Sequence, residues 1–532
     1  MGNALGRPSN SNQEEHPELS ARENDLARKR HINESTFSPP TPTKDLQPKR
    51  KRLRSTSQYI YDALFVHGEN SDVTISSLDR KWNLHKVYLR QAGYFKSMFH
   101  KSQWKESSMT VIDLQIPDSN IDENALDITF GSLYSEEVLI CPEKVVSILA
   151  AASLIQLEGL MQQCAEVMKE AVCLDNVCLY YKTACMYGQN EVAKNCMAWL
   201  ETNLMTSQSL DLLRELEPNL LTDVINSPNL IVIQIEMDIY TILKKWLYLK
   251  LNPEYSGEFK GILTVADNYF RELAKTTTTV FLDSQQGQPY IQVFQALRLQ
   301  HIIRDFVSCR ELEKDLIIPW SWLSPLYRQQ WLSMLREEQS LDAGPKICDE
   351  KDFECNGLRC GRLLLRDTDH CWRWNGYNFG LDLLVSYSSQ FPKTISLRRN
   401  VQSQRCSSSV NFAQSRNIIF RMHVASVNDK GHTILRLSTG NMPLTLEKEE
   451  EKVILTIDKE LLPENVHKKQ GGWNSCFPLL IAATFQLVSG PTAPEMSDGG
   501  YAILPLPNLN LSTPTLGEAE IGDLNKDDDD PE

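Results

Sequence analysis

The sequence predicts a multidomain α+β protein: an α/β domain, then an all-helical domain, then a C-terminal β-sandwich-like domain, with disordered tails. Residues 73–75 and 82–84 alternate apolar and polar side chains, and helical spacing begins at Val87. From residue 175 to 340 apolar residues recur at helical spacing throughout. Beyond Gly357 the period becomes two and β-branched residues gather, which is typical of short strands.

The composition limits the classes of function. The chain has 532 residues, room for about three or four domains. Its net charge of −14 argues against a protein that coats DNA or an anionic membrane, so no direct nucleic acid partner is expected. Thirteen cysteines, mostly inside helical patterns, favour reduced thiols in the cytosol or nucleus. The longest apolar run, 476–488, is too short for a transmembrane segment, and no signal peptide is expected.

Residues 1–56 form a polar segment that we expect to be disordered, as we do the acidic tail at 511–532. Gly2 is a candidate for lipidation after removal of Met1, although Gly6 stands where myristoylation prefers Ser or Thr. Such a lipid would give only peripheral membrane association. A compact basic run resembles a nuclear localisation signal; its cations are Lys49, Arg50, Lys51, Arg52 and Arg54. The alternative is a solvated run or one that contacts acidic lipid headgroups.

The α/β domain is expected to span residues 57–172. Ser55 and Gln58 form a capping-box pattern at the start of its first helix. A strand is predicted at 109–116 and a helix at 122–134. Pro142 suits the first position of the next helix, and residues 157–171 carry a helical apolar stripe that we assign to the core.

Its opening resembles a BTB (POZ) domain, because Asp72 precedes a strand pair that runs into His85 and Lys86, with Tyr94-Phe95 and Met98-Phe99 close behind. The resemblance implies that Asp72 and Lys86 lie close together near a homodimer interface. Residues 173–342 resemble the helical BACK domain that often follows BTB. The match is poorer between 252 and 279, where we expect an insertion or an irregular loop.

Residues 343–510 are expected to form the β-rich domain. Its predicted strands are 381–387, 394–397, 418–424, 434–437 and 453–457, with a Gly-ended loop at 428–431. The segment Trp372-Arg373-Trp374 suits a substrate-binding surface, since Trp and Arg dominate binding hot spots. At strand spacing, however, both tryptophans point to one face, and burial in the core is the favoured interpretation.

Trp104-Lys105-Glu106 lies in a polar loop between the Phe99 helix and the next strand. BTB proteins that recruit cullin-3 ubiquitin ligases carry a hydrophobic-x-Glu motif in the same loop, so the resemblance implies cullin binding through Trp104 and Glu106. The aromatic side chain would fill a pocket on the partner and the carboxylate would fix the register. The alternative is that Trp104 folds back onto its own domain.

We find no pattern that supports catalysis, and expect neither an enzyme nor a cofactor: nucleophile elbow, P-loop, zinc-protease and dinucleotide motifs are all missing. Kelch repeats and two-Cys two-His fingers are missing too. The metal-like residues have spacings that fit zinc poorly, so no metal is expected; they are Cys348, Cys355, Cys360, His370 and Cys371.

The order BTB, BACK and a non-kelch β domain behind a basic run resembles the germ cell-less family, from about residue 55 to 462. The closest stretches are residues 55–61, 68–72, 104–109 and 371–380. The resemblance implies a nuclear-envelope or nuclear-matrix protein, with lamina or envelope proteins as partners and a role in germ-cell formation or gametogenesis. It also implies a dimeric adaptor that brings an unknown protein substrate to a cullin-3 ligase. The alternative is a non-catalytic nuclear-envelope scaffold or transcriptional co-repressor.

Overall fold

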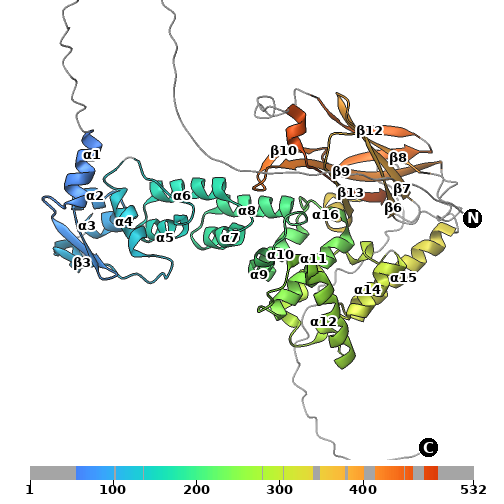
Figure 1. Ribbon diagram of the computed structural model, residues 1–532, viewed down its shortest axis with the longest axis horizontal. Coiled ribbons are helices and arrows are strands. Elements are labelled where there is room, and N and C mark those ends of the chain that lie inside the picture. Colours follow the sequence, from blue (N-terminus) through green and yellow to red (C-terminus); the bar gives the residue numbers. More distant parts are fainter. Residues whose placement is uncertain are drawn as a thin grey trace, which may run out of the picture. The chain divides into compact units, whose positions relative to one another are not determined.

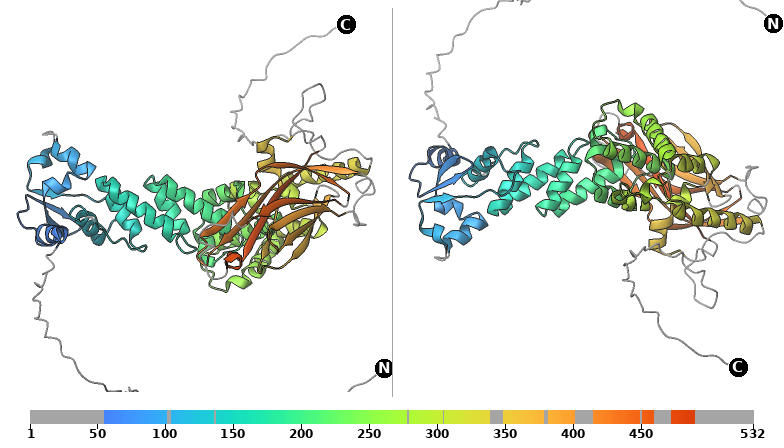
Figure 2. Two further views of the ribbon diagram at one scale, coloured as in Figure 1. Left: turned by 90° about the horizontal axis from the view of Figure 1, so that it is seen from above. Right: turned by 90° about the horizontal axis from the view of Figure 1, so that it is seen from below.

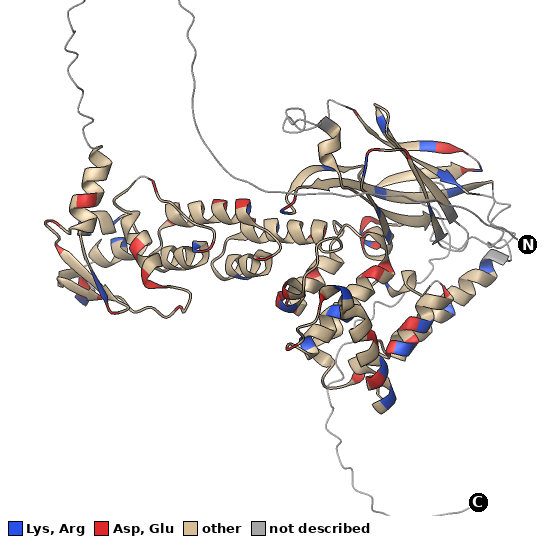
Figure 3. Ribbon diagram, in the orientation of Figure 1, with Lys and Arg blue, Asp and Glu red and all other residues tan. Residues whose placement is uncertain are grey.

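The computed structural model describes residues 55–100, 104–135, 137–277, 279–303, 305–338, 348–377, 381–400, 414–448, 450–458 and 472–488 (Figure 1). Gly2, the basic run and the acidic tail lie outside the described residues. Lys and Arg are interspersed with Asp and Glu along the described helices and strands (Figure 3). In the part of the chain that is described, no helix is long and apolar enough to cross a membrane.

The first domain opens with helix α1 (Thr56–Ile60), which continues as a π-helical turn over Tyr61–Val66. The Ser55 side chain accepts a hydrogen bond from the backbone N–H of Gln58, as the capping-box pattern predicts. The Gln58 side chain donates to Asp62 instead of returning to the N-cap, so the box is only half formed.

A three-stranded sheet follows, with β1 (Val73–Ser77) between β2 (Arg80–Leu84) and β3 (Val111–Asp113). β2 is antiparallel to β1, and β3 is parallel to it. β3 is shorter than the predicted 109–116 because it pairs with only three residues of β1. The helices of this domain are α2 (Lys86–Leu89), α3 (Gly93–His100), α4 (Glu123–Gly131), α5 (Val145–Ile155) and α6 (Glu158–Ala171). Pro142 lies in a turn before α5 and does not open the helix, contrary to the prediction.

The helical region shares one continuous apolar core with the first domain. Its helices are α7 (Val177–Met186), α8 (Asn190–Asn203), α9 (Leu210–Glu215), α10 (Pro218–Asn226), α11 (Glu236–Leu251), α12 (Ile262–Thr276), α13 (Ile291–Gln295), α14 (Phe306–Asp315) and α15 (Trp320–Glu338). Of the two alternatives predicted for 252–279, the irregular loop was wrong, because α12 occupies most of this range, whereas an insertion stays a prediction. That helix buries Ile262, Ala266 and Phe270, one residue per turn.

The C-terminal domain begins with α16 (Glu350–Asn356) and consists of two sheets (Figure 2). The first contains β10 (Thr433–Ser438), β9 (Ser415–Val427), β13 (Leu479–Val488) and β5 (Leu358–Leu364), and β11 (Met442–Glu447) also pairs with β9. The second contains β12 (Glu451–Ile457), β8 (Lys393–Arg399), β7 (Leu381–Ser388) and β6 (His370–Tyr377). Buried side chains from both sheets form one apolar cluster, which confirms the predicted sandwich. All five predicted strands are present.

Trp372 and Trp374 on β6 are buried in this cluster. The ring of Trp374 packs at 5.6 Å between centroids against Phe485 of β13, which belongs to the facing sheet. Burial confirms the core interpretation and excludes both tryptophans from a substrate-binding surface. Arg373 alternates with them on the strand and is exposed.

The helical region and the sandwich are joined by a shared strand pair. β4 (Gln234–Ile235) pairs antiparallel with β5 and thereby extends the first sheet, although the sequence pattern predicted only helices there. The preceding residues approach β5 closely: a Cβ at Gly361 would clash with the carbonyl oxygen of Val232. Glycine is therefore required where the two segments meet.

A buried ionic cluster stands at the same junction. The Glu236 carboxylate, fully buried at the start of α11, accepts hydrogen bonds from Nε and Nη2 of Arg359 on β5, at 3.1 and 2.6 Å. It also accepts the backbone N–H of Arg298, whose guanidinium donates to the carbonyls of Gly357 and Glu354. Burial raises the pKa of the Glu236 carboxyl, but the two arginines outweigh it and hold the pKa below its usual range. The carboxylate is thus charged and fully paired.

Candidate functional site

Asp72 and Lys86 lie close together, at the point where β2 leads into α2. Oδ1 of Asp72 accepts a hydrogen bond of 2.8 Å from the backbone N–H of Lys86, the first residue of the helix. The contact is therefore a helix cap and does not use the lysine charge. The Lys86 side chain makes separate contacts: Nζ lies over the ring of Phe99 and 3.4 Å from the carbonyl oxygen of Ser107. Lys86 thus connects the cap to the loop that carries Trp104.

Replacing Asp72 with alanine should lower the free energy of unfolding of this domain by about 1 kcal/mol, because the N–H of Lys86 loses its acceptor. Asp72→Asn keeps an acceptor oxygen and should lose much less. Hydrogen exchange of the α2 amides in the full chain measures both effects. Equal losses in the two variants would show that the negative charge of Asp72, and not the cap, stabilises the domain.

His85 is buried and has a structural role at the same junction. Its backbone N–H donates to the hydroxyl oxygen of Tyr134 at 2.9 Å, and Nδ1 lies 3.1 Å from the same oxygen. Nε2 lies 2.8 Å from the carbonyl oxygen of Glu69, which can only accept. Nε2 therefore carries the proton and Nδ1 accepts from Tyr134. Both ring nitrogens are satisfied internally, and the imidazole is not available to a ligand.

The Trp104 loop, residues 104–109, is held in a compact 3₁₀ turn. The Ser107 side chain and backbone N–H both donate to the carbonyl oxygen of Trp104, at 2.7 and 3.1 Å. Trp104 is 42% exposed, and its ring packs edge-to-face with that of Tyr94 on α3, with 6.3 Å between the centroids. Met109 is also exposed. The loop therefore presents an apolar side chain to solvent from a fixed backbone.

Glu106 lies on the same turn and is half-buried. Burial and the negative charge of Glu106 both raise the pKa of the Tyr94 hydroxyl, the phenol against whose ring the Trp104 indole packs. Trp104 and Glu106 thus stand on one turn, and the ring of Tyr94 packs against Trp104. Tyr94 was not predicted as a site residue, because at helical spacing beside Phe95 it resembles any core aromatic.

The cysteines and histidine considered for zinc are dispersed. Cys360 is buried on β5, whereas Cys371 is exposed on β6 and lies 3.8 Å from the hydroxyl of Ser386. Cys355 is exposed on α16. Within the described residues, no three His, Cys, Asp or Glu side chains are grouped as metal ligands.

A hollow of about 350 Å³ opens on the second sheet, away from the sandwich core. Small polar side chains on the central strands form its floor, and acidic side chains stand at its edge; they include Cys371, Ser386, Thr394, Ser396, Asp369 and Glu451. The sequence could not reveal it, since alternating Ser and Thr are typical of any solvated face.

Known proteins with similar sequences identify the domain that carries these residues. Residues 61–172 match the BTB/POZ domain family, a span that contains Asp72, His85, Lys86 and the Trp104 loop. Human germ cell-less protein-like 1 is 48% identical over 83% of both chains. Human germ cell-less protein-like 2 is 46% identical over 83% of this chain and 81% of its own length, and Drosophila melanogaster protein germ cell-less is 33% identical over 90% and 84%.

The chain belongs to the germ cell-less family.

Membership of the germ cell-less family, together with the BTB domain, indicates a protein that dimerises and works through protein–protein contacts, as an adaptor or scaffold. In this germ cell-less family member, the Trp104 loop lies within the matched BTB span. It carries an exposed apolar side chain and a carboxylate on a fixed backbone.

Proposed function

We propose that this germ cell-less family protein is a substrate-specific adaptor of a cullin-3 ubiquitin ligase. It dimerises through its BTB domain and acts in the nucleus at the envelope, in germ-cell formation or gametogenesis. The observation that carries the proposal is the exposed Trp104, which stands two residues before the half-buried Glu106 on one fixed turn. This pair has the chemistry and the loop position of the hydrophobic-x-Glu motif of cullin-binding BTB proteins.

The pair suits the capture of a helix of a partner protein. An indole that is partly exposed in the free protein gains most when it is buried in an apolar pocket. Because Tyr94 packs against the ring and Ser107 fixes the turn, little side-chain freedom is lost on binding. The Glu106 carboxylate then accepts hydrogen bonds from the partner and fixes its register.

The remaining regions fit the work of an adaptor. The shared β4–β5 pair and the Glu236 cluster join the helical region firmly to the sandwich. A substrate bound by the sandwich therefore keeps a fixed position relative to the helical region. With the two tryptophans of β6 buried, the polar hollow lined by Ser386, Ser396 and Glu451 is the candidate substrate surface. The basic run 49–54 supplies nuclear import, and a lipid on Gly2 would add a peripheral membrane anchor.

The test is whether the purified full-length chain forms a stoichiometric complex with the N-terminal region of cullin-3. We expect one cullin fragment per chain, on a dimer of the adaptor, by size-exclusion chromatography with light scattering. A folded dimer that leaves the cullin fragment unbound would contradict the adaptor role. That result would favour the non-catalytic nuclear-envelope scaffold or co-repressor, for which dimerisation and the basic run suffice.

A further inference from the structure

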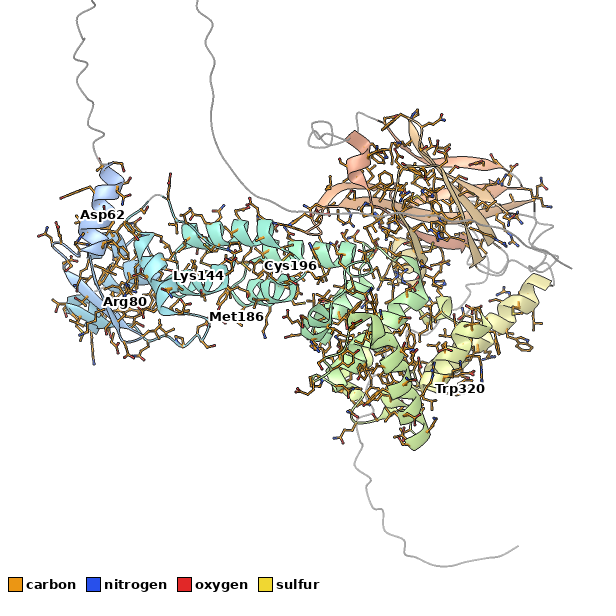
Figure 4. The ribbon with its side chains drawn as sticks, in the orientation of Figure 1. Asp62, Arg80, Lys144, Met186, Cys196 and Trp320 are labelled. Atoms are coloured by element: carbon orange, nitrogen blue, oxygen red, sulfur yellow. The ribbon has the colours of Figure 1, made fainter. Side chains whose placement is uncertain are left out.

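Helix α15 carries a row of large apolar side chains that are exposed, apart from the half-buried Tyr327. Trp320, Tyr327, Trp331 and Met334 follow one another at intervals that keep them on one side of the helix. Trp320 and Trp331 are each 59% exposed and Met334 is 48% exposed (Trp320 is labelled in Figure 4). The rings of Trp320 and Tyr327 are in contact, with centroids 5.6 Å apart.

Helix α14 extends this row. The hydroxyl of Tyr327 adjoins the thiol of Cys309 on α14, where burial and this neighbour raise the pKa of the tyrosine to about 12. Phe306 lies one turn before Cys309, on the same side of α14, and is 79% exposed. We call the set of Phe306, Trp320, Tyr327, Trp331 and Met334 the aromatic surface. Exposed apolar patches of this kind mark binding sites.

The chain itself contains a segment with matching chemistry. Residues 501–511, which the structure does not describe, read Tyr-Ala-Ile-Leu-Pro-Leu-Pro-Asn-Leu-Asn-Leu and contain no charged side chain. On either side of them the tail is polar and acidic, with Asp498 before and Glu518 after. Leu-Pro-Leu-Pro favours the polyproline II conformation, which docks on exposed aromatic rings at low entropic cost.

The chain also leaves the sandwich close to the aromatic surface. Phe485, near the end of β13, pairs with Leu358 at the start of β5. The neighbouring Asn356 carbonyl is 2.7 Å from Nε2 of His301. The carbonyl of Gln300, the residue before His301, accepts a hydrogen bond of 3.0 Å from the side chain of Gln330, which precedes Trp331 on α15.

Twelve residues, 489–500, separate the end of β13 from the apolar segment. Fully extended they span about 40 Å. The series from β13 to Gln330 consists only of direct contacts and steps of one or two residues, which is within that reach. We therefore propose that residues 501–511 dock on the aromatic surface of α14 and α15 of their own chain.

Photo-cross-linking of the full-length chain tests this docking. With benzoylphenylalanine in place of Trp331, irradiation should yield cross-links to peptides covering residues 501–511. A Leu504→Asp/Leu506→Asp tail should remove them, because a charged side chain cannot be buried against the rings. In parallel, amide exchange of residues 501–511 should accelerate by about tenfold in Trp320→Ser/Trp331→Ser. The control Leu139→Ser, at a residue that is 92% exposed in the first domain, should leave that exchange unchanged.

Co-expression of two tagged copies identifies the source of the docked tail. One copy carries the cross-linker together with the Leu504→Asp/Leu506→Asp tail, and the other is unmodified. Docking within one chain predicts that the cross-link disappears from this mixed complex. Cross-links to the tail of the unmodified copy would overturn the proposal in favour of a contact between copies. The proposal would also be overturned if, in the chain with the unmodified tail, the amides of residues 501–511 exchange without protection and no cross-links to them form. The aromatic surface would then be a binding site for a different protein.

Discussion

Glu236→Gln is expected to destabilise the joined helical region and sandwich by about 3–5 kcal/mol, the cost of removing one partner from a buried ionic cluster. The variant keeps the shape of the side chain but leaves the buried guanidinium of Arg359 without its counter-charge. The neutral amide can accept only part of the hydrogen bonding that Arg359 and Arg298 now share.

Hydrogen exchange of the β5 amides in the full chain measures this loss, since a chain with several domains need not unfold in one step. The matched control is Glu123→Gln, which removes an exposed ion pair with Arg80 and should change stability by less than about 1 kcal/mol. Similar effects of the two substitutions would contradict the importance of the buried cluster.

The pKa of Glu236 also fixes the sign of a pH dependence. Its folded-state pKa is lowered, so its stabilising contribution is fully present above the unfolded value of about 4.3 and is lost as the pH falls through the folded value. Between pH 7 and 5 the contribution should therefore stay constant. Below pH 4.3 the native chain should lose stability more steeply than Glu236→Gln does.

Trp104→Ala is expected to weaken cullin-3 binding by about 30-fold or more, the effect of removing an aromatic anchor worth about 2 kcal/mol. Adding Glu106→Ala should bring the affinity below detection, because the carboxylate that fixes the register is lost as well. The BTB dimer should remain folded, since neither residue contributes to the buried core of the domain.

Calorimetric titration with the cullin N-terminal region measures the affinity, and light scattering confirms the dimer. Trp320→Ala is the matched control, because its indole is equally a surface group but lies on α15. An unchanged affinity in the Trp104/Glu106 double variant would contradict the proposed function. Loss of the dimer in that variant would show a structural role for the loop instead.

Elements with one face in the core and one in solvent could be predicted from the sequence. β1 alternates cleanly because Val73 and Ile75 point inward and Thr74 does not. β13 gave no such alternation, since seven successive residues from Leu479 are buried as the strand runs between β9 and β5. The two-residue strand β4 exists only because β5 lies beside it, and no local pattern can signal such a strand.

The candidate site was predictable in part for similar reasons. Trp104 and Glu106 are neighbours in the sequence, so a pattern can find them, and the polar loop around them suggested exposure. The closeness of Asp72 and Lys86 came from the family resemblance, but only the structure shows that the backbone N–H, and not the lysine charge, makes the contact. The pairing of Glu236 with Arg359 joins residues 123 positions apart, and nothing in either local sequence marks it.

That separation has a consequence for biosynthesis. The carboxylate of Glu236 leaves the ribosome long before Arg359, and at about 5–20 residues per second the interval is roughly 6–25 s. During that time the start of α11 lacks the counter-charge of Arg359, and the edge formed by β4 lacks its partner strand. A nascent germ cell-less chain therefore passes through a stage in which its helical region is synthesised but unfinished, with an open strand edge suited to recognition by a chaperone.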